Sequence, residues 1–376
     1  MKKIQMVDLL SQFRKIEPEV MQAIKTVIEN TAFIKGPEVR EFAEKLENYL
    51  GVNHAIPCGN GTDALQVALM ALDLKPGDEI ITTPFTFIAT IEVIKLLGLK
   101  PVLVDIEEDS FNLDVNQIKS ALTEKTKVIL PVHLYGQCAN MSAITEIARE
   151  NGLFVVEDTA QALGADYFFE KNTSKKAGTI GDVGCTSFFP SKNLGAFGDG
   201  GAIFTNDEKL AEKISTMVNH GMKIKYHYDY VGVNSRLDTL QAAILNIKIK
   251  YLDEYHLARQ KAAEYYDNSL RDMENIIIPP RLNYSNHIFH QYTLRVKHNK
   301  RDDLKHHLNQ HDIPAMIYYP LGLHLQEAYR DLGYKEGDFP VTEKASKEVI
   351  SLPMHTELTR DQLDYICGTI ENFFKD

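Results

Sequence analysis

The middle of the chain alternates short apolar runs of strand composition with stretches of helical spacing, and this alternation constrains the fold more than any other feature. Between about residues 55 and 205, the expected strands are 79–85, 101–106, 127–134, 153–158, 182–189 and 201–206. Helical patterns lie between them, at 63–74, 88–98, 115–122 and 141–152. Because parallel strands need a crossover that is usually a helix, this order predicts an α/β fold with a mostly parallel central sheet.

A long helical pattern covers residues 238–270, and the chain changes character beyond it. The segments 290–296, 313–320 and 349–355 have strand composition and are separated by helix-like stretches. We therefore expect a large α/β domain over residues 1–250 and a smaller C-terminal α+β domain over residues 251–376. The polar, glycine-containing segment 171–182 is expected to be a loop.

The bulk composition excludes several classes of protein. The 376 residues carry a net charge of −11, which argues against a nucleic-acid partner, because phosphate neutralisation needs clustered Lys and Arg. The four cysteines form no C-x-x-C pair and the histidines show no ligand spacing, so we expect reduced thiols and no metal. We see no signal peptide and no apolar run of the ~18 residues that a membrane helix needs. The expectation is a cytoplasmic protein without membrane contact.

Residues 187–201, SFFPSKNLGAFGDGG, set one lysine, Lys192, ahead of four glycines. A nucleophilic lysine must be partly deprotonated, which requires desolvation or a neighbouring cation. The flanking SFFP and LGAF supply apolar cover, and glycine lets the backbone approach closely and adopt positive φ. A single lysine in a glycine loop is more often an ordinary surface residue, so the rest of the sequence has to decide its role.

Two motifs are candidates for holding an anion and a heteroaromatic ring. GNGTDAL (59–65) is a glycine turn ahead of a helical pattern, with Thr62 as candidate N-cap, and the amides of such a turn can bind a phosphate. VVEDTAQALGA (155–165) ends an apolar run with Asp158, and Gln161 follows. The carboxylate could keep a ring nitrogen protonated and the amide could reach a ring hydroxyl. Simple helix capping explains either motif equally well when it is taken alone.

Two further segments carry candidate ligand contacts. FTFIAT (85–90) offers Phe85 and Phe87, of which one ring could stack on a planar cofactor, although both could equally be core residues. GVNSRLDTLQAAIL (232–245) places Asn234 and Arg236 before the long helix. Arginine binds carboxylate or phosphate through two parallel hydrogen bonds, but a solvated helix start is the plain alternative.

A lysine, a phosphate cradle, a strand-end aspartate and a stacking aromatic ring are together what pyridoxal phosphate requires. With these motifs in this order, the sequence resembles the DegT/DnrJ/StrS sugar-nucleotide aminotransferases, which have the fold-type I (aspartate-aminotransferase-like) architecture. The resemblance runs from FIKGPEV (33–39) to YYPLGLHLQ (318–326) and so covers nearly the whole chain. It implies a pyridoxal 5′-phosphate-dependent transaminase.

The resemblance also implies a role for each matching residue. Lys192 would form the Schiff base with the cofactor and then act as general base and acid in the proton shift. Asp158 would pair with the protonated pyridine nitrogen, Gln161 would contact the ring hydroxyl and Phe87 would stack on the ring. The phosphate would be held by Gly61, Thr62 and Ser187 and, from the partner subunit of a homodimer with shared active sites, by Asn234.

The implied reaction moves an amino group from L-glutamate to a keto-sugar on a nucleoside diphosphate. Relatives that dehydrate 4-keto sugars carry histidine at the position of Lys192, so the lysine favours transamination. Residues 220–245 resemble the subgroup that acts on UDP-2-acetamido-2-deoxy-3-oxo-glucuronate in the biosynthesis of lipopolysaccharide and other surface polysaccharides. The alternatives are a 3-keto or 4-keto deoxyhexose on UDP, dTDP or GDP and, more remotely, a non-catalytic cofactor-binding regulator.

Four residues are expected to contact the substrate. Arg236 is expected to bind a carboxylate of the amino donor or of an acidic sugar, and His227 and His324 to line the sugar pocket. Many relatives have His-Tyr-Pro where this chain has Tyr318-Tyr319-Pro320, so Tyr318 could shift the choice of substrate.

Overall fold

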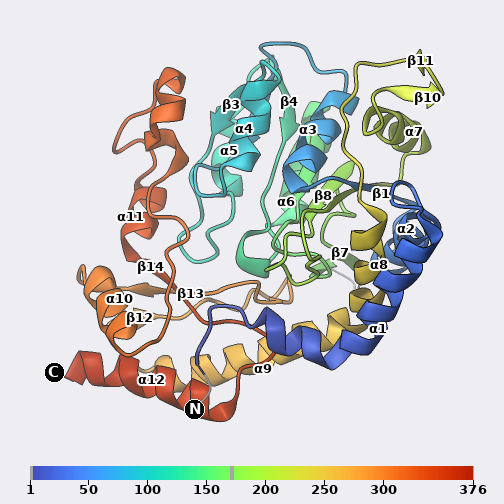
Figure 1. Ribbon diagram of the computed structural model, residues 1–376. Coiled ribbons are helices and arrows are strands. Elements are labelled where there is room, and N and C mark those ends of the chain that lie inside the picture. The colour runs from blue at the N-terminus through green and yellow to red at the C-terminus, as the bar shows by residue number, and fades with distance from the viewer. Residues whose placement is uncertain (1–2, 170–172, 376) are drawn as a thin grey trace.

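The computed structural model describes residues 3–169 and 173–375. A seven-stranded sheet with the order β1-β9-β8-β5-β4-β2-β3 lies at its centre (Figure 1). Its strands are β1 (His54–Cys58), β2 (Glu79–Thr82), β3 (Lys100–Leu103), β4 (Thr126–Ile129), β5 (Phe154–Asp158), β8 (Val183–Ser187) and β9 (Gly201–Thr205). β9 pairs antiparallel with both of its neighbours, and the other pairs are parallel. The predicted α/β class with a mostly parallel sheet is confirmed.

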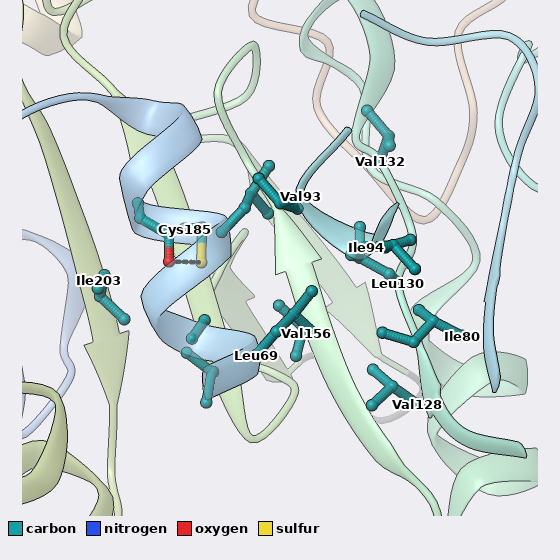
Figure 2. Close-up of a cluster of buried hydrophobic side chains, with 14 of the residues drawn as sticks. Leu69, Ile80, Val93, Ile94, Val128, Leu130, Val132, Val156, Cys185 and Ile203 are labelled. Carbon is teal, nitrogen blue, oxygen red and sulfur yellow. Dashed lines mark hydrogen bonds between the residues drawn. The ribbon is translucent and has the colours of Figure 1, made fainter. Parts of the chain in front are cut away.

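Helices cover both faces of this sheet. Adjacent residues of each central strand point to opposite faces, and because both sets are apolar, both faces have to be covered. Ile80, Val128 and Val156 belong to one buried cluster, and their neighbours Ile81, Ile129 and Val155 belong to another. The first cluster includes Leu69, Val93 and Ile94 (Figure 2) and is covered by α3 (Gly61–Ala71), α4 (Ala89–Leu96) and α7 (Glu208–Met217). The second is covered by α5 (Val115–Ala121) and α6 (Met141–Asn151).

The long helical pattern at 238–270 is two helices rather than one. α8 (Thr239–Lys248) and α9 (Leu252–Leu270) are separated by a 3-10 turn over Ile249–Tyr251. The N-terminal helices α1 (Leu9–Asn30) and α2 (Pro37–Leu50) both pack on α8.

A second, three-stranded antiparallel sheet lies towards the C-terminus (Figure 1). It consists of β12 (Ile276–Ile277), β13 (Tyr292–Val296) and β14 (Val349–Leu352), with α10 (Arg301–Gln310), α11 (Pro340–Glu348) and α12 (Arg360–Lys375) around it. Its core includes Ile4, so the first residues of the chain pack with the last third. The division into domains at residue 250 stays a prediction, although α9 begins close to it.

Two local expectations were wrong, and one strand had not been expected. The segment 171–182 was expected to be a loop, but Thr173–Lys176 form β7, which pairs with β6 (Asp166–Phe169); residues 170–172 lie outside the described residues. The segment 313–320 makes only an isolated bridge, between Met316 and Ser351. Strand β1 was not expected, since it is short and contains Pro57, which is tolerated at this edge of the sheet.

The remaining elements are short. β10 (Met222–Ile224) and β11 (His227–Tyr228) form a small hairpin, and 3-10 turns cover Leu134–Gly136, Leu323–Leu325 and Glu327–Leu332. None of the described helices has both the length and the apolar character that crossing a membrane requires.

Candidate active site

A cavity of about 770 Å³ lies at the carboxyl edge of the seven-stranded sheet. Asp158 is the last residue of β5 and Ser187 the last residue of β8, and both line the cavity together with the first turn of α3. The carboxyl ends of parallel strands are where such sheets bind ligands. Eight of the predicted site residues meet here, namely Gly61, Thr62, Phe87, Asp158, Gln161, Ser187, Lys192 and Tyr318.

The N-terminus of α3 presents free amides to the cavity. The N-cap is Asn60, whose side chain accepts from the amide of Asp63 at 2.8 Å, so the expectation that Thr62 caps the helix was wrong. The carbonyl of Asn60 accepts from the amide of Ala64 at 3.0 Å. Among the described residues this leaves the amides of Gly61 and Thr62 without an acceptor. Two such amides at the positive end of a helix can bind a phosphate.

Gly61 is required by the close approach of two parts of this cradle. A Cβ built on Gly61 would come within 2.7 Å of the Cβ of Ser187. Side chains essentially never pack that closely, so only glycine brings the helix start against the end of β8. The hydroxyl of Ser187 and the amides of α3 therefore face the same small volume.

Asp158 supplies a buried carboxylate to the cavity. Its Oδ2 accepts from the hydroxyl of Thr90 at 3.1 Å and its Oδ1 from the amide of Ala160 at 3.1 Å. Burial raises the pKa of Asp158, against the stabilising effects of that amide, of Lys192 and of Thr90. A cationic N–H in the cavity would offset this cost by pairing with the ionised carboxylate.

The orientation of Gln161 is fixed by its neighbours. Its Oε1 accepts from the amide of Tyr135 at 2.7 Å, so the amide group must point its Nε2 the other way. Nε2 donates one hydrogen to the hydroxyl of Tyr319 at 3.1 Å. The second hydrogen remains for a ligand oxygen, as a contact to a ring hydroxyl requires.

The two phenylalanines of FTFIAT lie in different environments. Phe85 is fully buried and packs its ring against Phe111 and Tyr319, so it is a core residue. Phe87 is 57% exposed and lines the cavity. A large apolar ring left open at a cavity wall is suited to covering a planar ligand.

Lys192 is half-buried in the cavity wall. Burial lowers the pKa of its amine to about 8, although the carboxylate of Asp158 acts in the opposite direction. The pKa of an ordinary lysine is near 10.4, so the Lys192 amine is neutral over a wider pH range than an ordinary lysine amine. The side chain therefore meets the requirement for a nucleophile and a proton acceptor.

The glycines after Lys192 serve close packing within the protein rather than unusual backbone angles. A Cβ on Gly195 would lie 2.2 Å from the carbonyl oxygen of Pro190, and one on Gly201 would lie 2.5 Å from the carbonyl carbon of Asn60. Neither residue has a φ in the left-handed region, so the expected positive φ was wrong here. Gly195 makes the turn that holds Lys192, and Gly201 brings β9 against the start of α3.

The other four predicted site residues lie outside the cavity lining. Asn234 is exposed and forms an isolated bridge with Asn219, and Arg236 is half-buried close enough to Lys35 to lower the pKa of that lysine, after burial itself. His227 is exposed on the β10–β11 hairpin. His324 is buried, and its Nε2 is hydrogen-bonded to the carboxylate of Glu343 on α11 at 3.1 Å.

Several cavity residues carried no sequence signal that we used. His290 and Gln291 precede β13, Met354 follows β14, and Met6 and Val7 belong to the N-terminal segment. No motif marks them, because they come from the C-terminal sheet and the chain start, far in sequence from the phosphate cradle. Other lining residues, among them Asn60, Ala160, Ser191 and Tyr319, lay within segments singled out for their resemblance.

A metal site is not found in the described residues. Within residues 3–169 and 173–375, no group of three or more His, Cys, Asp or Glu side chains is arranged to hold an ion.

The comparisons with known proteins agree with this geometry. The model of the DegT/DnrJ/EryC1/StrS aminotransferase family matches residues 14–371. A pleiotropic regulatory protein of Geobacillus stearothermophilus is 46% identical over 99% of each chain. The UDP-2-acetamido-2-deoxy-3-oxo-D-glucuronate aminotransferase of Pseudomonas aeruginosa is 43% identical over 98% of this chain and 100% of its own. DesV of S. venezuelae, solved with a ketimine intermediate, is 35% identical, covers 100% of both chains and superposes with a TM-score of 0.95.

The fold and the cavity therefore define a fold-type I, pyridoxal phosphate-dependent aminotransferase. The chain belongs to the DegT/DnrJ/EryC1/StrS aminotransferase family.

The residues present fit this cofactor. The two open amides of α3 suit its phosphate, and the buried carboxylate of Asp158 suits a protonated ring nitrogen. The fixed Nε2 of Gln161 suits its ring hydroxyl. The amine of Lys192, whose pKa is lowered to about 8, suits its aldehyde.

We predict that Lys192 of the cofactor-free protein reacts with an amine-acylating reagent with a midpoint near pH 8, because burial favours its neutral form. Replacing Asp158 with Asn removes the charge that opposes this effect, so the midpoint should move to lower pH. Labelling at each pH is quantified by peptide mass spectrometry.

Lys248 is an internal control for this measurement. Burial also lowers its pKa to about 8, but its side chain is 2% exposed and donates to the carbonyl of Gly195 at 2.5 Å. Lys248 should stay unlabelled. A Lys192 midpoint near that of a usual lysine would contradict the assignment.

We predict that Gly61→Ala weakens cofactor binding, because the added methyl group collides with Ser187. Overpacking costs about 1–3 kcal/mol, which corresponds to about a 5- to 150-fold higher Kd for pyridoxal phosphate. The control is Gly368→Ala in α12, where no atom lies within 4 Å of the new Cβ. Equal Kd values for the two variants, measured by titrating cofactor into the stripped proteins, would show that the cradle does not bind the phosphate.

Proposed function

We propose that this protein transfers the amino group of L-glutamate to a nucleotide-linked keto-sugar, and that the acceptor is UDP-2-acetamido-2-deoxy-3-oxo-glucuronate. The observation that carries the reaction is the cavity that holds Lys192, Asp158 and the α3 cradle together. The choice of acceptor is supported by the similarity to the Pseudomonas aeruginosa enzyme and by the resemblance of residues 220–245. A cytoplasmic location, as expected from the sequence, is part of the proposal.

When bound, the cofactor supplies an aldehyde for amine exchange and a ring that withdraws electrons. The side chains of Asp158 and Lys192 would orient the cofactor and move the protons. Asp158 would hold a proton on the ring nitrogen, and its bonds to Thr90 and Ala160 fix the orientation of the carboxylate. Lys192 Nζ would take a proton from the amino donor's α-carbon and deliver one to the cofactor's former aldehyde carbon, since an amine with a pKa of about 8 is a competent general base.

The acceptor would lie against the cavity wall that includes residues from the C-terminal part of the chain. His290, Gln291, Tyr318 and Met354 line this wall and mix polar groups with apolar surface, as sugar and nucleotide binding requires. Arg236 is proposed to reach into the partner subunit's site and to bind there the carboxylate of the uronate or of glutamate. Asn234 is proposed to contact the cofactor phosphate in the same site. Both side chains lie outside their own chain's cavity lining, which is consistent with a role in the second site of a homodimer.

A second candidate function has a specific observation behind it, because the relative from Geobacillus stearothermophilus is named a pleiotropic regulatory protein. A regulator that only binds the cofactor has no need of a lysine with a lowered pKa in the cavity. Lys192→Ala separates the two functions, since it should abolish transamination while a purely regulatory role would not depend on turnover.

We predict that kcat/KM is higher for UDP-2-acetamido-2-deoxy-3-oxo-glucuronate than for the matched sugar with an uncharged C6 hydroxymethyl group. A hydrogen bond to a charged group is worth about 1.5–3 kcal/mol, so the ratio should be about 10- to 150-fold. Arg236→Met should remove most of this preference, and Arg236→Lys should keep part of it.

The measurement is the initial rate with each acceptor at fixed glutamate. An equal or higher kcat/KM for the uncharged sugar, or for a dTDP- or GDP-linked deoxyhexose, would replace the proposed acceptor with the corresponding alternative.

We predict that two inactive variants, Lys192→Ala and Asn234→Ala, recover activity when their subunits are mixed. Each mixed dimer has one intact site of its two, so the isolated mixed dimer should show about half of wild-type activity. Differently tagged subunits are co-expressed and the mixed dimer is isolated through both tags. A mixed dimer as inactive as its parents would contradict a shared site.

A further inference from the structure

A buried arginine on α9 bonds to the backbone of the cavity wall. Arg259 is 3% exposed, and its Nη1 donates to the carbonyl oxygens of Phe289 at 3.0 Å, His290 at 3.2 Å and Met354 at 3.0 Å. No carboxylate among the described residues forms an ion pair with it. A buried charge without an opposite charge is costly to a fold, so a guanidinium kept there needs a reason beyond stability.

The three carbonyls belong to two separate segments that carry cavity residues. His290 lies before β13 and Met354 after β14, and both side chains line the cavity. Met354 extends the connection, since its amide donates to the carbonyl of Met6 at 3.2 Å and Met6 also lines the cavity. One guanidinium thus holds two wall segments directly and the N-terminal segment through a single further hydrogen bond.

The same wall is also tied to the Lys192 turn. Asn193 follows Lys192, and its Nδ2 donates to the carbonyl of Ile288 at 3.2 Å. The stretch from Ile288 to His290 is therefore fixed at consecutive carbonyls, by Asn193 at the first and by Arg259 at the next two. Its position relative to the Lys192 amine depends on both groups.

The residues predicted to bind the cofactor are positioned by other contacts. Gly61 and Ser187 are held by α3 and β8, Asp158 by Thr90 and Ala160, and Gln161 by Tyr135. In the part of the chain that the structure describes, Arg259 forms no hydrogen bond with any of these groups. Loss of Arg259 should therefore disturb one wall and spare the other.

We propose that Arg259 is a positioning residue for the substrate wall, which sets acceptor binding and turnover by holding the segments of His290, Met354 and Met6. It does not line the cavity, so it acts through these segments and not by touching the substrate. The identity of the acceptor in this inference rests on the proposed function, whereas the ordering of the wall does not.

The test compares Arg259→Met and Arg259→Lys with a control, Arg271→Met. Arg271 is exposed at the C-terminal end of the same helix and bonds only to neighbouring residues, Asp267 and Asn268, in the described structure. In the cofactor-free proteins, amide hydrogen exchange should accelerate at least tenfold in Arg259→Met for peptides containing residues 4–8, 287–292 and 352–356. Peptides containing residues 60–66 and 156–162 should be unchanged, and Arg259→Lys should fall between wild type and Arg259→Met.

In the cofactor-loaded enzymes, Arg259→Met should raise the acceptor KM or lower kcat by about tenfold or more, with partial rescue in Arg259→Lys. The Kd for pyridoxal phosphate should stay within about twofold of wild type. Unchanged kinetics and exchange in Arg259→Met would overturn the proposal, and so would an equal loss of protection across all peptides together with lost cofactor affinity. If Arg259→Met does not fold, Arg259→Lys decides by the same criteria.

The proposed function and the positioning role of Arg259 can fail independently of each other. If no keto-sugar nucleotide is aminated by the wild-type enzyme, the proposed function fails, while local exchange still reports whether Arg259 orders the wall. If amination occurs but exchange and acceptor KM do not respond to Arg259→Lys and Arg259→Met, only the positioning role fails.

Discussion

The burial of two adjacent carboxylates at the end of β5 is the constraint on which the rest of the site depends. Glu157 is fully buried, and although burial acts to raise its pKa, the bond from His133 and the amides of Gly178 and Gly181 lower that pKa overall. Asp158 faces the cavity with fewer donors, and burial raises its pKa. One carboxylate is thus satisfied by the protein and anchors the strand end, while its neighbour is left to be satisfied by a cationic ligand.

Contacts within the protein hold the parts of the site together. Close contacts at Gly61, Gly195 and Gly201 bring the α3 cradle, the Lys192 turn and β9 together at distances that a Cβ would prevent. Two buried basic side chains on α8 and α9 support the same region, since Lys248 bonds to the carbonyl of Gly195 and Arg259 to the carbonyls of Phe289, His290 and Met354. Such preorganisation lowers the cost of ordering side chains when cofactor and substrates bind.

The sequence predicted the part of this structure that is local in the chain. The strand–helix alternation follows the order of elements in the sheet, and the residues predicted to bind the cofactor follow strand ends or precede a helix, so motifs bring them out. The structure then decided what motifs left open: Phe85 is core and Phe87 faces the cavity, and Asn60 rather than Thr62 caps α3. The wall of His290, Met354 and Met6 could not be predicted, because its residues meet only through tertiary contacts such as those of Arg259.

The central claim is that Lys192, Asp158 and the cradle form a working transaminase site, and the most direct measurement is the absorption spectrum of the cofactor-loaded protein during titration with L-glutamate. The account predicts that the visible band of bound pyridoxal phosphate disappears, that the near-ultraviolet band of the pyridoxamine form grows in equal proportion, and that a keto-sugar nucleotide restores the first band. Lys192→Ala should show none of these changes on the same time scale. A wild-type spectrum that glutamate and other amino donors leave unchanged would contradict the claim.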